Sequence, residues 1–235
     1  MQHWQSNGES VLRVENLCKS FGKQQVLNNV GFSLKRTERV AITGPSGSGK
    51  STLLNCLAGL ETPDAGKINF LGKNILEMPE AEVTQLRRGH LTSIFQFFHL
   101  LPTLRAWENV EFPLLLRKTS SAKRKTLVGA LLEEVGLTHR SEAWPSELSG
   151  GEMQRLAIAR ALITEPAMIL ADEPTGSLDS QNSDRILKLL STLAERHGTA
   201  LLMVTHDPVA SAICDRILHM LDGKLEESHP VTEGA

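Results

Sequence analysis

The sequence predicts an α/β fold with a mostly parallel sheet and an inserted helical segment. A short apolar stretch, Arg39 to Thr43, runs into a glycine-rich turn that is followed by a helix. Strands and helices alternate again after residue 150, and the stretch between these two parts has helical periodicity. Because strand–helix–strand succession brings strands together in parallel, we expect helices on both faces of the sheet.

The N-terminal elements are predicted from alternation. Between residues 11 and 32, apolar and polar residues alternate with turn residues between the runs, as in strands. After the strand at 39–43 we expect a helix over 52–60, and the turn Gly72-Lys73-Asn74 after residues 67–71 indicates another short strand pair.

The remaining elements are predicted from periodicity and capping. Residues 80–148 are expected to be helical, and Gly136 is the expected C-cap of a helix whose apolar residues have helical spacing: Leu127, Leu131, Leu132 and Val135. Further along, the patterns predict a helix over 151–164, a strand over 167–172, a helix over 180–196 and a strand over 200–205.

Composition excludes several classes of protein. The 235 residues carry a net charge of −2, so no global basic field indicates a nucleic-acid binder, and we expect no nucleic acid partner. Three widely spaced cysteines without a Cys-x-x-Cys pair argue for a reducing compartment and against zinc. No apolar run approaches the ~18–20 residues of a transmembrane helix, and the N-terminus lacks a secretory signal pattern. We expect a cytosolic protein whose membrane role would come through partners.

The glycine-rich turn matches the phosphate-binding pattern G-x-x-x-x-G-K-[ST]. It consists of Gly44, Pro45, Ser46, Gly47, Ser48, Gly49, Lys50 and Ser51. Glycines let the backbone approach a phosphate, backbone N–H groups surround the anion, and the following helix N-terminus adds its dipole. We expect Lys50 to neutralise the β- and γ-phosphates and Ser51 to bind Mg²⁺.

Two carboxylates end the apolar stretch Met168 to Ala171. Asp172 at the end of a buried strand can hold Mg²⁺ through water, and Glu173 can polarise the attacking water as a general base. Strands that end in Asp-Glu are common, and many are merely solvated ends. The motif gains its meaning from sharing a chain with the phosphate-binding turn.

A Ser-Gly-Gly sequence opens the helix predicted over 151–164, and by itself it is an N-cap. With its neighbours it reads Leu148-Ser149-Gly150-Gly151-Glu152-Met153-Gln154-Arg155, which resembles the L-S-G-G-[EQ]-x-Q-R signature of the ABC ATPase family. Gln96 lies at the Q-loop position, Ser177-Leu178-Asp179 at the D-loop, and His206 follows a predicted strand. The motifs occur in the family's order, and the resemblance covers about Val11 to Lys224.

The resemblance implies a P-loop NTPase core with a mostly parallel sheet, a small N-terminal antiparallel β subdomain and an inserted helical subdomain. It implies one domain over residues 11–224, with the core at 11–93 and 150–224, the helical subdomain at about 94–149, and tails at 1–10 and 225–235. It implies catalytic roles for Glu173, His206 and Gln96, and Mg²⁺ ligation by Ser51, Gln96 and Asp172. The implied ATP contacts are residues 44–51, Thr52, Phe21, Ser149, Gly150, Gly151 and Asp179.

The resemblance also implies two copies of the chain that clamp two ATP molecules head to tail. Phe21 occupies the place of the family's adenine-stacking aromatic residue, although it could equally belong to the core. The cluster Phe95-Gln96-Phe97-Phe98 is either core or an apolar groove that receives a helix of a membrane partner. In the family this segment lines that groove, so a permease subunit is expected to dock near Phe95–Leu104.

The segment Phe95 to Leu116 and the sequence Ala171 to Asp179 are similar to those of the LolD, MacB and FtsE group. Met153 and Ser177 depart from the commoner residues of the family. The group implies a peripheral ATPase at the cytoplasmic face of the inner membrane, which drives export or release of lipoproteins, peptides or small molecules. A non-transport ABC ATPase, as an FtsE-like regulator or a soluble repair or translation factor, is the alternative. An inactive scaffold is disfavoured because Lys50, Asp172, Glu173 and His206 are all present.

Overall fold

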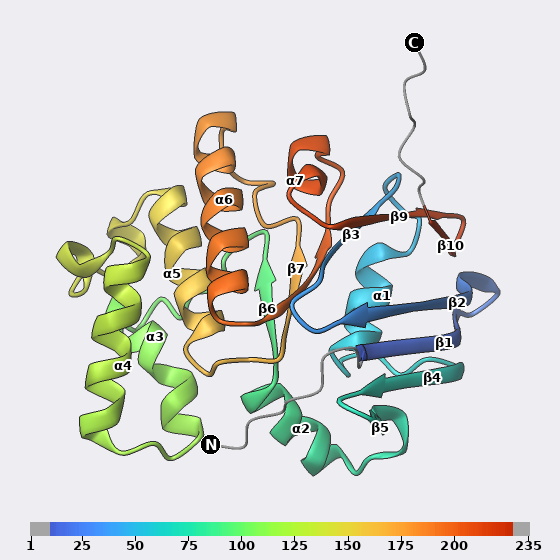
Figure 1. Cartoon of the computed structure of the whole chain (residues 1–235), viewed down its shortest axis with the longest axis horizontal. Coiled ribbons are helices and arrows are strands. Elements are labelled where there is room, and N and C mark those ends of the chain that lie inside the picture. Colours follow the sequence, from blue (N-terminus) through green and yellow to red (C-terminus); the bar gives the residue numbers. More distant parts are fainter. Residues whose placement is uncertain (1–9, 228–235) are drawn as a thin grey trace.

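A six-stranded sheet forms the centre of the computed structural model, which describes residues 10–227 (Figure 1). The strand order is β10-β9-β3-β8-β7-β6, and all neighbours pair in parallel except β10, which is antiparallel to β9. The mostly parallel sheet is therefore confirmed. Its strands are β3 (Arg39–Thr43), β6 (Leu91–Phe95), β7 (Met168–Asp172), β8 (Ala200–Val204), β9 (Arg216–Leu221) and β10 (Lys224–Glu227).

Apolar side chains on both faces bury the central strands. In β8, Ala200, Leu202 and Val204 belong to one core cluster, whereas Leu201 and Met203 belong to a second cluster across the sheet. Successive residues of a strand point to opposite faces, so a strand covered on both sides needs a continuous apolar run. The sequence of β8 meets that requirement, and its five residues are all buried.

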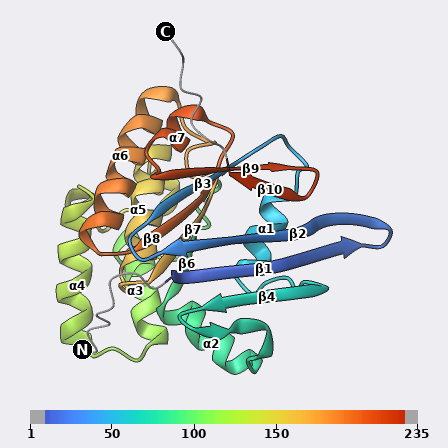
Figure 2. The same ribbon diagram turned by 45° about the vertical axis from the view of Figure 1, so that its right-hand side comes forward.

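The first core cluster lies between the central sheet, helix α1 and an antiparallel sheet (Figure 2). The second sheet has the order β2-β1-β4-β5 with every pairing antiparallel, which confirms the N-terminal antiparallel subdomain. Its large buried side chains include Leu12, Ile68 and Phe70. The elements are β1 (Ser10–Phe21), β2 (Gln24–Lys35), β4 (Ala65–Phe70), β5 (Lys73–Asn74) and α1 (Lys50–Leu57).

The second core cluster lies between the other face of the central sheet and the helices that Figure 1 shows on the left. These helices are α3 (Ala106–Leu116), α4 (Ser121–Glu134), α5 (Gly150–Leu162) and α6 (Ser180–Arg196). The other helical elements are α2 (Glu80–Gly89), α7 (Pro208–Ala212) and the 3-10 turns Ile75–Glu77, Thr138–Arg140 and Pro145–Glu147. Gly136 has φ +69°, and its N–H donates to Glu133, so it ends α4 as predicted.

The structure corrects the sequence-based predictions at both edges of the central sheet. Residues 91–95 were expected to be helical but form β6, because they pair with β7. The strand has only five residues, so it hardly changes the helical periodicity of the longer segment around it. The hairpin of β9 and β10 was not predicted, and its residues 225–227 were expected in the C-terminal tail. Ser10, expected in the N-terminal tail, begins β1, and the other tail residues lie outside the described range.

Leu190 of α6 provides a test of this packing. Its side chain is fully buried in the second core cluster, so Leu190→Ala should lower the free energy of unfolding by about 2–5 kcal/mol. Urea denaturation measures the loss. Lys188→Ala, at an exposed position of the same helix, is the matched control and should change stability by less than about 0.5 kcal/mol. Equal losses in both variants would contradict the assigned face of α6.

Candidate nucleotide site

The glycine-rich turn joins the end of β3 to the start of α1. Gly44 and Gly49 have φ of +146° and +107°, a region that side chains disfavour. A Cβ at Gly44 would lie 2.1 Å from the Met220 carbonyl oxygen, and one at Gly49 would lie 2.7 Å from that of Val26. Lys50 Nζ donates to the carbonyl oxygens of Gly44 at 2.9 Å and Pro45 at 2.8 Å. Side chains therefore do not fit at Gly44 and Gly49, and the Lys50 ammonium group is held across the loop.

A cavity of about 760 Å³ opens above this turn. It brings together residues that lie far apart in the sequence, from the ends of β1, β3, β6, β7 and β8. Val26 lines it although the sequence did not indicate a role for it, and predicted Ser48 does not line it, because its side chain is buried within the turn. The predicted residues in the lining are Phe21, Gly44, Pro45, Ser46, Gly47, Gly49, Lys50, Ser51, Thr52, Gln96, Asp172, Glu173 and His206.

Glu173 and His206 form a pair at the carboxyl ends of β7 and β8. The Glu173 Oε1 atom accepts from the His206 backbone N at 3.1 Å and lies 2.7 Å from His206 Nδ1. Glu173 has φ +45°, an unusual backbone conformation for a non-glycine residue, and its N–H donates to the Val204 carbonyl at 2.9 Å. Both contacts with His206 use Oε1, so Oε2 can accept a hydrogen bond from a water in the cavity.

Asp172 provides a carboxylate beside Lys50 and Ser51. Burial and the neighbouring charge of Glu173 raise its pKa, whereas Lys50 and Ser51 oppose that change. A cation beside Asp172 would relieve the repulsion between the two carboxylates. Ser51, Gln96 and Asp172 all line the cavity with oxygen donors, which Mg²⁺ prefers, and Mg²⁺ usually takes few protein ligands together with water and phosphates. These residues therefore fit Mg²⁺.

Gln96 contacts the turn that leads to Asp179. Ser177 Oγ donates to the Gln96 carbonyl at 2.9 Å, and a Cβ at Gly176 would lie 2.8 Å from Gln96 Nε2. The Gln96 side chain thus passes over Gly176 and would respond to any shift of residues 176–177.

The other predicted ATP contacts lie outside this cavity. Ser149 is the exposed N-cap of α5, and its N–H donates to Glu152 Oε2 at 2.8 Å, which completes a capping box. Gly150 and Gly151 follow in the first turn of the same helix. Asp179 is the N-cap of α6, where it accepts from Asn182 N at 2.9 Å. Within one chain, the structure does not bring these four residues to the glycine-rich turn.

Gln154 is a buried residue to which the sequence analysis gave no role. Its Nε2 donates to the Pro174 carbonyl and thereby joins α5 to the turn after Glu173. Ile158, four residues after Gln154, lies on the same face of the helix, and a glutamine on an apolar face could have indicated this contact, since a buried amide needs a partner.

The exposure of Phe21 and Phe97 decides whether these two aromatic residues belong to the core. Phe21 is 51% exposed at the end of β1, so it does not belong to the core. Phe97 is 70% exposed, which excludes the core for this member of the cluster. Phe98, which is half-buried, and His99 have φ of 59° and 47°, and Arg160 donates to both of their carbonyl oxygens.

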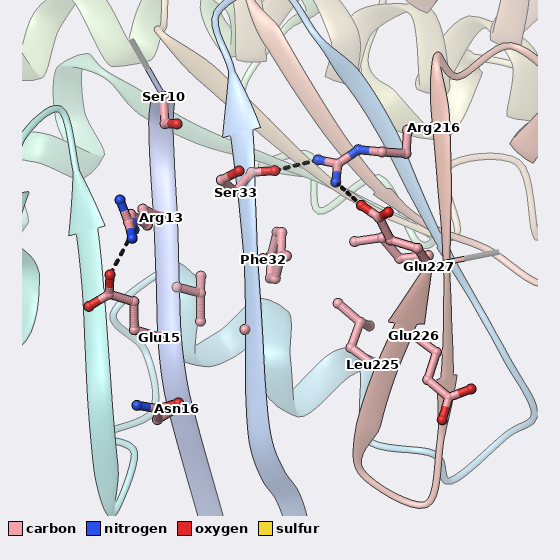
Figure 3. A pocket seen from close by; sticks show the side chains of 13 residues that line it. Ser10, Arg13, Glu15, Asn16, Phe32, Ser33, Arg216, Leu225, Glu226 and Glu227 are labelled. Carbon is pink, nitrogen blue, oxygen red and sulfur yellow. Dashed lines mark hydrogen bonds and ion pairs between the residues drawn. The ribbon is translucent and has the colours of Figure 1, made fainter. Parts of the chain in front are cut away.

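Another cavity, of about 810 Å³, lies between β1, β2 and the β9–β10 hairpin (Figure 3). Its two arginines are already paired with carboxylates. Arg13 Nε lies 2.7 Å from Glu15, and Arg216 lies 2.8 Å from Glu227 and 3.0 Å from Glu38. It is therefore not the better candidate, because Lys50, Asp172 and Glu173, which suit phosphate chemistry, line the cavity at the glycine-rich turn.

Comparison with known proteins agrees with this geometry. A family described as ABC transporter matches residues 27–176. The uncharacterized ABC transporter ATP-binding protein YbbA of Escherichia coli is 46% identical over 223 residues, which cover 93% of this chain and 98% of YbbA.

Solved structures of ATP-binding cassettes are also similar. MJ0796, described as a dimeric cassette in a post-hydrolysis state bound to ADP and Pi, has a TM-score of 0.82 and 36% identity over 92% of this chain and 98% of its own. CbiO1 of Clostridium perfringens, described as part of the transporter complex cbiONQ, has a TM-score of 0.86 and 29% identity over 93% of this chain and 87% of its own. The matched family spans the glycine-rich turn, Gln96, Ser149 and Glu173, so the chain belongs to the ABC transporter family as an ATP-binding subunit that hydrolyses ATP.

Proposed function

We propose that this chain is the ATPase motor of a membrane transporter and that two copies close head to tail around two ATP molecules. One observation carries the proposal. The cavity holds the phosphate-binding turn and the carboxylates, whereas Ser149, Gly150 and Gly151 lie at an α5 N-terminus outside it. A helix N-terminus attracts anions, so a second copy can supply this group to the γ-phosphate. The description of MJ0796 as a dimer supports the arrangement.

In the proposed reaction, the backbone N–H groups of residues 44–51 and the Lys50 ammonium bind the phosphates of ATP. Ser51, Gln96 and Asp172 would hold Mg²⁺, which neutralises charge on the phosphates when bound. Glu173 accepts a proton from the attacking water through its carboxylate, and His206 fixes the orientation of that carboxylate through Oε1. Asp179 would lie close to the nucleotide site of the second copy, because it begins α6, which packs beside α5.

We propose that the partner is an integral membrane permease that docks near Phe95–Leu104, at the cytoplasmic face of the inner membrane. A groove of about 440 Å³ supports this, since it adjoins the segment at Phe95 and is also lined by the apolar side chains of Leu60 and Leu116. Among residues 10–227, no helix has both the length and the apolar character needed to cross a membrane. CbiO1 is described as part of a transporter complex. By similarity to the LolD and MacB group, the transporter would export or release lipoproteins, peptides or small molecules.

Glu173→Gln tests the proposed chemistry. The amide keeps the shape of the side chain but is a poor base, so ATP turnover should fall about 10²–10⁴-fold while ATP binding persists. ATP should then produce a stable dimer, visible by size-exclusion chromatography. Glu165→Gln, a substitution at an exposed glutamate outside the cavity, is the control. Parental turnover in Glu173→Gln would remove Glu173 from the role of general base.

Mixed dimers test the head-to-tail arrangement. A Lys50→Ala chain lacks a phosphate-binding group, and a Ser149→Arg chain blocks the signature face. When the two variants are mixed, one composite site is damaged twice and the other remains intact. The mixture should therefore dimerise with ATP better than either pure variant, as measured by light scattering. Normal ATP-driven dimerisation of both pure variants would contradict the arrangement.

Phe97→Asp tests docking of the membrane partner at the segment Phe95–Leu104. Because Phe97 is 70% exposed, the melting temperature and the basal ATPase rate should stay near those of the parent. Loss of an aromatic anchor commonly costs about 2 kcal/mol or more of binding, so recovery with the membrane fraction should fall. Phe70→Asp is the contrasting control, because Phe70 is 1% exposed and its substitution should lower the melting temperature strongly. A comparable drop in melting temperature for Phe97→Asp would assign Phe97 to the core.

A further inference from the structure

A charged side chain contacts the exposed aromatic ring of the nucleotide cavity. The ammonium of Lys19, two residues before Phe21 on β1, lies 5.0 Å from the centroid of the Phe21 ring. A cation within ~6 Å of a ring centroid is attracted by the negative face of the ring. Phe21 lines the cavity and Lys19 does not, so the Lys19 side chain does not take up the space beside the ring that a nucleotide base would need.

The Lys19 ammonium is itself held by the segment that follows α1. It donates to the Thr62 carbonyl at 2.7 Å and to Glu61 Oε1 at 2.6 Å, and Asp64 lies 3.9 Å away. An ammonium has three N–H donors, so two of them go to Thr62 and Glu61. The Lys19 side chain is only 11% exposed. The hydrogen bond to Glu61 raises the pKa of the Lys19 ammonium group.

The same segment fixes the strand that carries Phe21. Asp64 Oδ2 accepts from the Ser20 N–H at 2.6 Å, and the Asp64 N–H donates to the Cys18 carbonyl at 2.8 Å. Because residues 61–64 follow the helix that begins with Lys50, they connect the phosphate-binding helix to the aromatic ring. Phe21 has no hydroxyl group that could orient its ring by a hydrogen bond, and its ring lies in cation–π contact with Lys19.

We propose that Lys19 is a positioning residue for nucleotide binding, which holds the Phe21 ring ready to stack on the base of ATP. The inference rests on the proposed role of Phe21 as the stacking residue. A ring that is ordered before binding loses less conformational entropy when the base arrives, and stacking is therefore stronger. The contribution of Lys19 affects stacking of the base on the Phe21 ring, not binding of the phosphates.

The test compares ATP with inorganic tripolyphosphate, which has no base, by isothermal titration calorimetry. Lys19→Met keeps an unbranched side chain, one atom shorter, and removes its charge. It should weaken ATP binding about two- to fivefold, as expected for a partly exposed cation–π contact, and leave tripolyphosphate binding unchanged. Lys19→Arg, which retains the cation, should restore ATP affinity. Weakening for both ligands by the same factor would mean a general disturbance of the fold and would overturn the inference.

Phe21→Ala separates this inference from the role of Phe21 itself. Alone it should weaken ATP binding, and in that background Lys19→Met should have no further effect. If Phe21→Ala weakens binding but Lys19→Met weakens it equally with and without the ring, Lys19 does not act through Phe21. If Phe21→Ala leaves ATP affinity unchanged, the stacking role fails and the inference fails with it.

Discussion

The turn between β3 and α1 lies against backbone carbonyl groups from both sheets. Gly44 packs on Met220 of β9, and Gly49 packs on Val26 of β2. The turn of the β9–β10 hairpin completes this contact, since the Gly223 N–H donates to the Ser48 carbonyl and the Gly223 carbonyl accepts from Asn28. At Gly44 and Gly49 the turn thus approaches the backbone of both sheets so closely that no side chain would fit, and these contacts help to fix the position of one sheet relative to the other. Because β1 belongs to the antiparallel sheet, the same contacts position Phe21 beside the cavity that the glycine-rich turn lines.

The carboxyl ends of the parallel strands supply the rest of the site. Asp172 ends β7, and Gln96 and His206 come just after β6 and β8, so pairing of these strands brings all three to one edge of the sheet. Ligands of open α/β sheets commonly bind at this edge. The left-handed backbone of Glu173 turns its carboxylate toward His206, and the pairing of the two side chains helps to offset that strain.

Contacts between the site and α5 provide a physical connection to the proposed dimer interface. Gln154 joins α5 to Pro174 next to Glu173, and Arg160 of the same helix holds the carbonyl groups of Phe98 and His99. One helix therefore contacts the segment behind Glu173, the proposed general base, and the segment proposed to meet the membrane partner. Such contacts can transmit a displacement only if α5 moves as a rigid body, which its nearly complete burial along one face favours.

Local chemistry allowed the sequence alone to determine much of this protein. The turn at 44–51 needs glycines, a lysine and a hydroxyl group at fixed spacing, so it could be predicted from the sequence alone. The apolar run of β8 needs cover on both faces of the sheet, so this buried strand could be predicted in the same way. The helix over 180–196 and the strand over 39–43 were also predicted with their observed bounds.

Tertiary structure alone decided features that depend on distant partners. The strand β6 is defined by its pairing with β7, and the residues of β9 and β10 gain their strand conformation from β3 and from each other. Whether Phe21 and Phe97 are buried or exposed depends on what packs against them, which no local pattern contains. The contacts of Lys19 with Glu61 and Thr62 likewise join residues more than 40 positions apart, and only folding of the chain brings their charges together.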